Sequence, residues 1–126
     1  MDRRSFISLL AAGASVLVLP VANGATSMYG LIGRVRATPG QRAALAAILL
    51  EGTTAMPGCL SYVIAEDPAD DDALWITEVW DSAASHQGSL ALPAVKDAIA
   101  RGRPLIAGFD SRAETRPLGG HGLQPG

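Results

Sequence analysis

The sequence contains a single cysteine, Cys59, so no disulfide can form within the chain. No basic residue lies beside Cys59 to activate its thiol, which is predicted to be buried and unreactive at the start of a strand. With only two histidines and no HxxxH or CxxC motif, the chain lacks the ligands that a stable transition-metal site usually needs. The sequence therefore predicts no metal centre.

Positive charge is also scarce. The 10 basic and 12 acidic residues give a net charge of −2, and no basic cluster of the kind that binds nucleic acid is present. No glycine-rich loop joins a strand to a helix, which argues against a dinucleotide site and predicts no organic cofactor. The acidic run DPADDD, residues 67–72, lacks the spacing and the glycine of a calcium loop and is predicted to be a solvated hairpin turn.

Residues 1–24 have the anatomy of an export signal: a basic start, an apolar run from about Phe6 to Leu19, and small residues up to Gly24. The stretch RRSFI resembles the twin-arginine signal. The apolar run is shorter than the roughly 20 residues of a membrane-spanning helix, which favours cleavage over an uncleaved anchor. The protein is therefore expected to be periplasmic or secreted, and to touch a membrane only through an uncleaved leader.

The apolar periodicity predicts the order strand, helix, strand, strand, helix, strand, which is the ferredoxin-like βαββαβ pattern of the α+β class. Thr38, Pro39 and Gln41 have the types expected at the start of the first helix. The expected ranges are 28–37, 38–55, 59–66, 73–81, 83–101 with a break near Pro93, and 105–116, followed by a flexible tail over 118–126.

In such a fold the two helices cover one face of the sheet only. The other face still carries apolar residues, and an uncovered apolar face predicts a partner. The simplest partner is a second copy of the chain, with the two sheets packed face to face in a symmetric homodimer.

Both tryptophans lie in the third predicted strand. Trp75 and Trp80 are an odd number of residues apart and must point to opposite faces of the sheet. Trp80 is expected beneath the helices and Trp75 at the dimer interface. Glu78 shares the face of Trp80, where a covered carboxylate needs a partner, and Arg34 on the first strand is the expected one.

Three stretches carry a resemblance to a known family. PGCLSY (57–62), ITEVWDSAASHQGSL (76–90) and LPAVKDAI (92–99) resemble the antibiotic biosynthesis monooxygenase domain, including the quinol monooxygenases within that family. The resemblance assigns residues 25–117 to this domain and implies a dimeric α/β barrel. It also implies that a small phenol, quinol or polyketide-like aromatic is oxidised with molecular oxygen and without a cofactor.

Such a reaction needs aromatic walls, a base, and a donor for developing negative charge. Histidine titrates nearest neutral pH, so His86 is the candidate base. Three candidates also have a structural interpretation: His86 as a partly exposed helix histidine, Glu78 as part of a structural ion pair, and Tyr62 as a core tyrosine. The candidate catalytic residues are His86, Trp80 and Tyr62, and the candidate substrate-binding residues are Arg34, Glu78 and Leu90.

One departure from the family bears on the activity. Well-studied oxygenases of this family and the haem-degrading relatives use an asparagine on a strand, whereas the only asparagine here is Asn23, in the predicted leader. This argues against haem degradation. Two further hypotheses for the function stay open: a non-enzymatic periplasmic binding module for a small aromatic or quinone, and a structural dimer without a ligand.

Overall fold

The computed structural model describes residues 27–123. The expected α+β ferredoxin-like βαββαβ order is confirmed, with one antiparallel sheet in the strand order β2-β3-β1-β4. The predicted export signal, residues 1–24, lies outside the described residues. The elements are β1 (Tyr29–Ala37), α2 (Arg42–Gly52), β2 (Cys59–Glu66), β3 (Ala73–Trp80), α3 (Ala83–Ser89), α4 (Pro93–Gly102), the short 3-10 helix η1 (Arg103–Leu105) and β4 (Ile106–Thr115).

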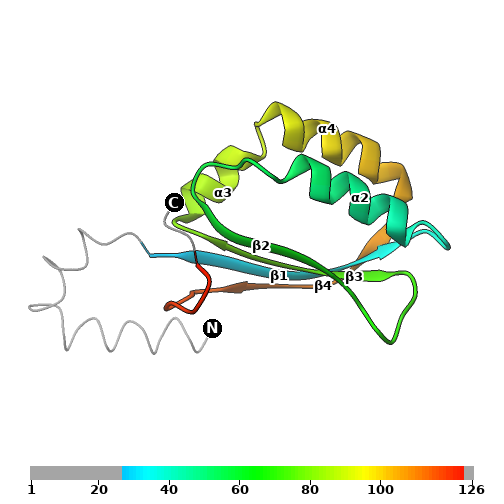
Figure 1. Cartoon of the computed structure of the whole chain (residues 1–126), viewed down its shortest axis with the longest axis horizontal. Helices are drawn as coiled ribbons and strands as arrows, with labels where there is room; N and C mark the ends of the chain where they lie inside the picture. Colours follow the sequence, from blue (N-terminus) through cyan, green and yellow to red (C-terminus); the bar gives the residue numbers. More distant parts are fainter. Residues whose placement is uncertain (1–26, 124–126) are drawn as a thin grey trace, which may run out of the picture.

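The molecule has two layers (Figure 1). Helices α2 and α4 lie side by side over one face of the sheet, and α3 lies at one end of it. The core between the layers is a cluster of Val35, Ala37, Leu45 and Leu74, all at most 2% exposed. Leu45 comes from α2 and the other three from β1 and β3, so this cluster fixes the helices over the sheet. None of the helices within residues 27–123 has the length and apolar character needed to cross a bilayer.

Helix α2 begins three residues later than its predicted first turn. Gln41, rather than Thr38, is the residue that precedes the helix, and its side chain makes no capping hydrogen bond. Gly40 adopts a left-handed φ of 78°, which a helix cannot contain, and the Gln41 amide donates to the Thr38 carbonyl in a turn. The predicted cap at Thr38 is therefore wrong, because Gly40 bends the chain before the helix starts.

Helix α3 begins as the sequence predicts. The hydroxyl of Ser82 accepts a hydrogen bond from the Ser85 amide at 3.1 Å, a side-chain cap at the first turn. Gly58, just before β2, has a φ of 84°, and a Cβ there would lie 2.4 Å from Ser85 Oγ. The lack of a side chain at Gly58 thus lets the start of β2 lie against the first turn of α3.

Strand β4 departs from simple alternation. Its register against β1 shifts between Arg34 and Val35, so that Ser111 pairs with Arg34 while Phe109 pairs with Val35. Asp110 is the extra residue at this bulge and lies on the same face as Arg34. Strict alternation along the predicted strand 105–116 would place Asp110 and Arg112 on one face, whereas the bulge places them on opposite faces. Past β4, residues 118–123 contain no helix or strand, and the predicted flexibility of the tail stays a prediction.

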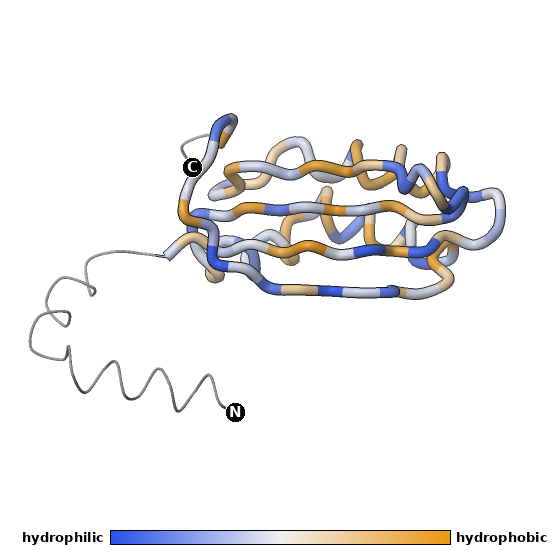
Figure 2. Tube along the Cα trace, turned by 90° about the horizontal axis from the view of Figure 1, so that it is seen from below, coloured by the Kyte–Doolittle hydropathy of each residue, from blue (hydrophilic) through white to orange (hydrophobic). Residues whose placement is uncertain are grey.

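The hairpin turn 67–72 joins β2 to β3 as predicted, but its acidic groups are not simply solvated. Arg34 donates to Asp67 at 3.0 Å and to Asp70 at 3.1 Å, and it also pairs with Asp110. Arg36 pairs with Asp70 and Asp110 at 2.8 and 2.9 Å. This acidic-basic cluster lies on the sheet face opposite α2 and α4, the face toward the viewer in Figure 2, and no helix within residues 27–123 covers it.

Candidate functional site

A small chamber lies between the sheet and the helices, with a volume of about 100 Å³. Five of the predicted site residues line it, and one of them, Leu90, is half-exposed. We call this space the polar chamber, because its walls hold titratable groups among apolar side chains. Its defining residues are Tyr62 from β2, Glu78 and Trp80 from β3, His86 from α3, and Leu90 just after α3.

His86 lies between two aromatic rings. Its imidazole is 5.2 Å from the Tyr29 ring centroid and 5.5 Å from that of Trp80, the latter edge-on at an interplanar angle of 74°. The side chain is 16% exposed, so it is largely shielded from solvent. Two rings that pack on the imidazole restrict its rotation, and the Ser82 cap fixes the helix that carries it.

Glu78 is the acceptor at the centre of this group. Its Oε1 accepts a 2.9 Å hydrogen bond from Trp80 Nε1 and lies 3.9 Å from His86 Nε2. Trp80 is 1% exposed and is thus fixed in the core, so the carboxylate that accepts from it is held in place beside the imidazole. The imidazole and the carboxylate therefore lie together in the wall of the chamber.

Tyr62 lies next to Glu78 on the neighbouring strand, where the two residues are paired in the sheet register. Burial raises the pKa of the Tyr62 phenol, and the nearby Glu78 carboxylate raises it further. No hydrogen bond joins its hydroxyl to another residue within 27–123. The phenol thus keeps its proton and has a donor available to a ligand in the chamber.

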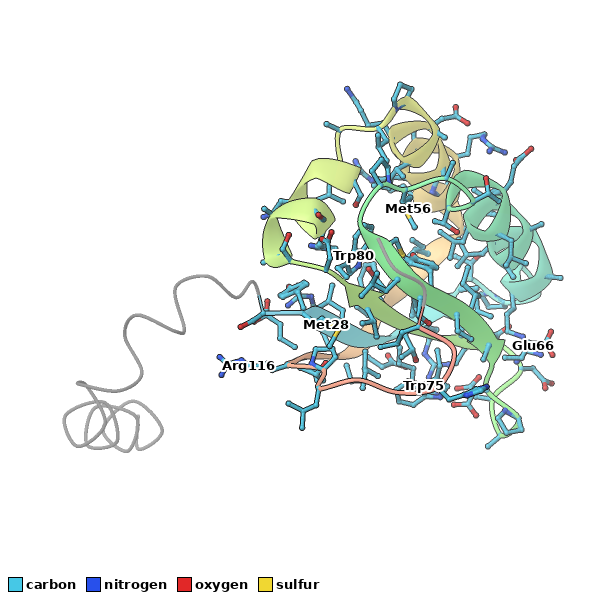
Figure 3. All side chains as sticks on the ribbon, turned by 60° about the vertical axis from the view of Figure 1, so that its left-hand side comes forward. Met28, Met56, Glu66, Trp75, Trp80 and Arg116 are labelled. Carbon is cyan, nitrogen blue, oxygen red and sulfur yellow. The ribbon has the colours of Figure 1, made fainter. Side chains whose placement is uncertain are left out.

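Arg34 does not join this site, and the predicted pair between Arg34 and Glu78 is wrong. Glu78 pairs with Leu31 in the register of β1, whereas Arg34 pairs with Trp75 on the opposite face. There the guanidinium lies 5.7 Å from the Trp75 ring centroid and binds Asp67. The side chains of a strand alternate between faces, so Arg34 cannot reach the chamber. Figure 3 shows Trp80 on the helix side of the sheet and Trp75 on the other side, as the sequence predicts.

Two residues near the site were not found from the sequence. The Tyr29 hydroxyl donates a 2.6 Å hydrogen bond to Glu114 Oε2, which raises the pKa of the Tyr29 phenol and anchors its ring against His86. Tyr29 pairs with Trp80 across β1 and β3, a register that alternation alone does not fix. Glu114 lies on β4 beyond the bulge, so its face could not be read from the sequence.

Two further cavities adjoin the polar chamber on the same face of the sheet. The first, called the passage, has a volume of about 120 Å³ and is lined by Leu31, Gly33, Ile76, Glu78, Phe109 and Arg112, among others. The second, called the apolar channel, has a volume of about 480 Å³ and lies between α4 and β4. Glu78 lines both the chamber and the passage, and Phe109 lines both the passage and the channel.

No group of three or more His, Cys, Asp or Glu side chains within residues 27–123 is arranged to hold a metal ion. The lone thiol of Cys59 is partly buried and donates to the Ser61 carbonyl. Burial raises the pKa of this thiol, so the thiolate is disfavoured. The reactive groups of the chamber are therefore an imidazole, a carboxylate and a phenol.

The sequence model of the antibiotic biosynthesis monooxygenase family matches residues 28–101, which run from β1 to the last turn of α4 and include every predicted site residue. The chain belongs to this family. Solved structures agree with the assignment. A proposed antibiotic biosynthesis monooxygenase from Chloroflexus aurantiacus is 69% identical, with a TM-score of 0.77, and the match covers 78% of this chain and 100% of the other.

More distant structures share the fold of this family. A proposed antibiotic biosynthesis monooxygenase from Caulobacter crescentus is 18% identical, covers 75% of this chain and 92% of its own, and has a TM-score of 0.67. A variant of SnoaB from Streptomyces nogalater, a cofactor-independent oxygenase, is 13% identical and has a TM-score of 0.63. The match covers 76% of this chain and 98% of the SnoaB chain. No curated protein sequence matches the chain.

Proposed function

We propose that this chain is a cofactor-independent monooxygenase that oxidises a small phenol or quinol with molecular oxygen in the polar chamber. The observation that carries the proposal is the placement of His86 beside Glu78 at the wall of a cavity that is otherwise largely apolar. The apolar side chains of the chamber can bind an aromatic ring, and the imidazole fixed among them can take a proton from the ring's hydroxyl.

The proposed reaction balances without an added reductant. His86 removes a hydroxyl proton, and the electron-rich anion gives an electron to oxygen and then forms a carbon–oxygen bond with it. The protonated imidazole returns its proton as the oxygen–oxygen bond breaks. A quinol and one oxygen molecule give a hydroxyquinone and water: one oxygen atom enters the ring, the other leaves as water, and the substrate supplies all four electrons. Tyr62, which keeps its proton, is the donor that stabilises the anion.

The shared fold supports this proposal but does not fix the substrate. SnoaB is a cofactor-independent oxygenase by description, and its fold is that of this chain. The described part of the chain contains no asparagine, so its imidazole and phenol take the place of the strand asparagine that the family resemblance implies.

The test is oxygen uptake by the metal-stripped protein with hydroquinones, naphthols and anthrones. His86→Ala should lower the rate 100-fold or more, in the range of a lost general base. His121→Ala removes the only other histidine, which is exposed in the tail, and should leave the rate unchanged. Saturable binding without oxygen uptake would contradict the proposal and favour a binding module for a small aromatic or quinone.

We further propose that the uncovered sheet face packs against a second copy of the chain. Ile32 and Val63 lie in one row across this face, paired through Thr77, and Val63 is 52% exposed. The charges at one end of the face are already paired with each other in the acidic-basic cluster, so a partner can cover them at a lower cost. Val63→Glu should turn the dimer into a monomer in sedimentation measurements, with Leu50→Glu on the outer side of α2 as the control.

Export by the twin-arginine route to the periplasm or the outside of the cell is also a proposal, and it rests on residues 1–24 alone. N-terminal sequencing of the protein from the periplasmic fraction tests it. We expect cleavage after Gly24 in the wild type. When Arg3 and Arg4 are both replaced by lysine, we expect the precursor to stay in the cytoplasm. A full-length product that stays in the cytoplasm in the wild type would contradict export.

A further inference from the structure

The space between the sheet and the helices is polar at one end and apolar at the other. Imidazole, carboxylate and phenol groups line the polar chamber, of about 100 Å³. The apolar channel is much larger, about 480 Å³, and Arg103 is the only charged residue in its wall. A single hydroxylated ring would occupy the chamber and leave the larger space without a ligand, although that space is within the size range of ordinary ligand pockets.

The chamber, the passage and the channel follow one another along the strands. Glu78 marks the level of the chamber and pairs with Leu31, whereas Val35 and Phe109 mark the level of the channel and pair with each other. Leu31 and Val35 are four residues apart on β1, and a strand rises about 3.4 Å per residue, so the two levels are separated by about 14 Å. An elongated ligand is needed to occupy both.

Gly33 leaves space in the passage between these levels. It lies between Leu31 and Val35 on the same face of β1 and pairs with Ile76. A Cβ at this position would meet only the Ser111 carbonyl, at 3.8 Å, so the space above Gly33 is free. A side chain that begins at such a Cβ would project into the passage.

We propose, on the basis of the proposed function, that the substrate is a hydroxylated ring with a flexible apolar arm of the alkyl or isoprenoid type. The ring lies in the polar chamber beside Glu78, and the arm crosses the passage over Gly33 into the apolar channel. Three spaces of unequal volume at successive levels fit a narrow, bendable arm better than a rigid plane of fused rings. Phe109, which is 72% exposed, forms the wall where the arm approaches the surface.

The test measures binding in the absence of oxygen, so that affinity is separated from turnover. The probes are hydroquinone and its methyl, butyl and hexyl derivatives. The dissociation constant of each is measured by equilibrium dialysis under nitrogen. Each buried methylene should tighten binding by up to about fourfold, which is the factor that burial of a methylene contributes. Gly33→Val should remove most of this gain for the butyl and hexyl probes and leave the affinity for hydroquinone within about twofold.

A second variant and a control distinguish a local effect on binding from a folding defect. Phe109→Ala should weaken the hexyl derivative more than the methyl one, since only the longer arm reaches that wall. Leu50→Ala removes an exposed leucine that lines none of the three cavities and should change no affinity. Equal affinity for all four hydroquinones would overturn the proposal. So would a gain seen with naphthol and anthrone but not with the alkyl series. If the wild-type protein consumes no oxygen but still binds the longer alkyl hydroquinones more tightly, the proposed reaction is wrong and the proposed binding mode stands.

Discussion

Trp80 donates a 2.9 Å hydrogen bond from its indole nitrogen to Glu78, two residues earlier on the same face of β3. This bond fixes the carboxylate that lies beside His86. Glu78→Gln keeps an acceptor for the indole but removes the negative charge next to the imidazole. We expect kcat for a quinol to fall on the order of tenfold to 100-fold while KM changes little. A matching loss of quinol affinity would instead give Glu78 a binding role.

Trp80 should contribute more to stability than Trp75. Trp80→Phe removes part of a side chain that is 1% exposed and leaves the Glu78 carboxylate without its donor, so a loss of about 2–3 kcal/mol in the free energy of unfolding is expected. Trp75→Phe also removes an indole donor, to Asp67, but Arg34 still binds that carboxylate. A loss of about 1 kcal/mol is expected there, and urea unfolding of both variants gives the comparison. Equal losses would contradict the assignment of Trp80 to the core.

Gly58 should be intolerant of any side chain. Gly58→Ala places a Cβ 2.4 Å from Ser85 Oγ at a φ of 84°, and both effects raise the energy of the native state. We expect a loss of about 2 kcal/mol or more in thermal unfolding, together with a displaced α3 and reduced turnover. Gly88→Ala in α3 is the matched control, because a Cβ there meets nothing within 4 Å. It should be neutral or slightly stabilising.

The acidic-basic cluster should make stability fall in acid. A hydrogen bond from the Asp72 amide, followed by the Arg36 and Arg34 guanidinium groups, lowers the pKa of Asp70 from 3.8 to about 2. The pKa of Asp67 is also lowered, first by the Ala69 amide and then by Arg34. A lowered native pKa contributes stability that is present above pH 3.8 and is lost as the pH falls toward 2.

Denaturation between pH 5 and pH 2 checks this slope. Arg36→Leu should reduce the dependence of stability on pH in that window, because the pKa of Asp70 then moves back toward its ordinary value. Arg101→Leu removes an arginine of similar exposure that pairs elsewhere, with Asp97 and Glu51, and is the control. An unchanged slope in Arg36→Leu would contradict the ion-pair explanation.

Ionisation of the Tyr62 phenol should destabilise the protein in alkali. Burial raises the pKa of its phenol above the ordinary value of 10.0, so the native state holds this proton more tightly than the unfolded chain does. Its contribution to stability is therefore present below pH 10 and is lost as the pH rises through the higher native value. Tyr62→Phe should flatten the decline of stability above pH 10, as followed by urea unfolding. Tyr29→Phe should flatten it less, because the raised pKa of Tyr29 comes first from a hydrogen bond to Glu114 that is exposed to solvent.

Much of the fold follows from local patterns in the sequence. Alternation places Trp75 and Trp80 on opposite faces, and Ser82 caps α3 through a short-range contact. The site is less accessible to such reasoning, because its members are joined across strands. Opposite charge predicts a pair between Arg34 and Glu78, although the two residues lie on opposite faces. The place of Tyr29 in the site depends on its register against Trp80, which is a tertiary property. The bulge at Asp110 has no local signal either.

The alternation in β3 has a consequence for how the gene can vary. Glu78 and Trp80 serve the helix side and Trp75 serves the open side, so a substitution at one of them leaves the opposite surface in place. Deletion of a single codon in the middle of β3 would shift one half of the strand by one residue and exchange its two surfaces at once. Insertions and deletions should thus be tolerated in the tail after Thr115 but eliminated from β3, even where single substitutions persist.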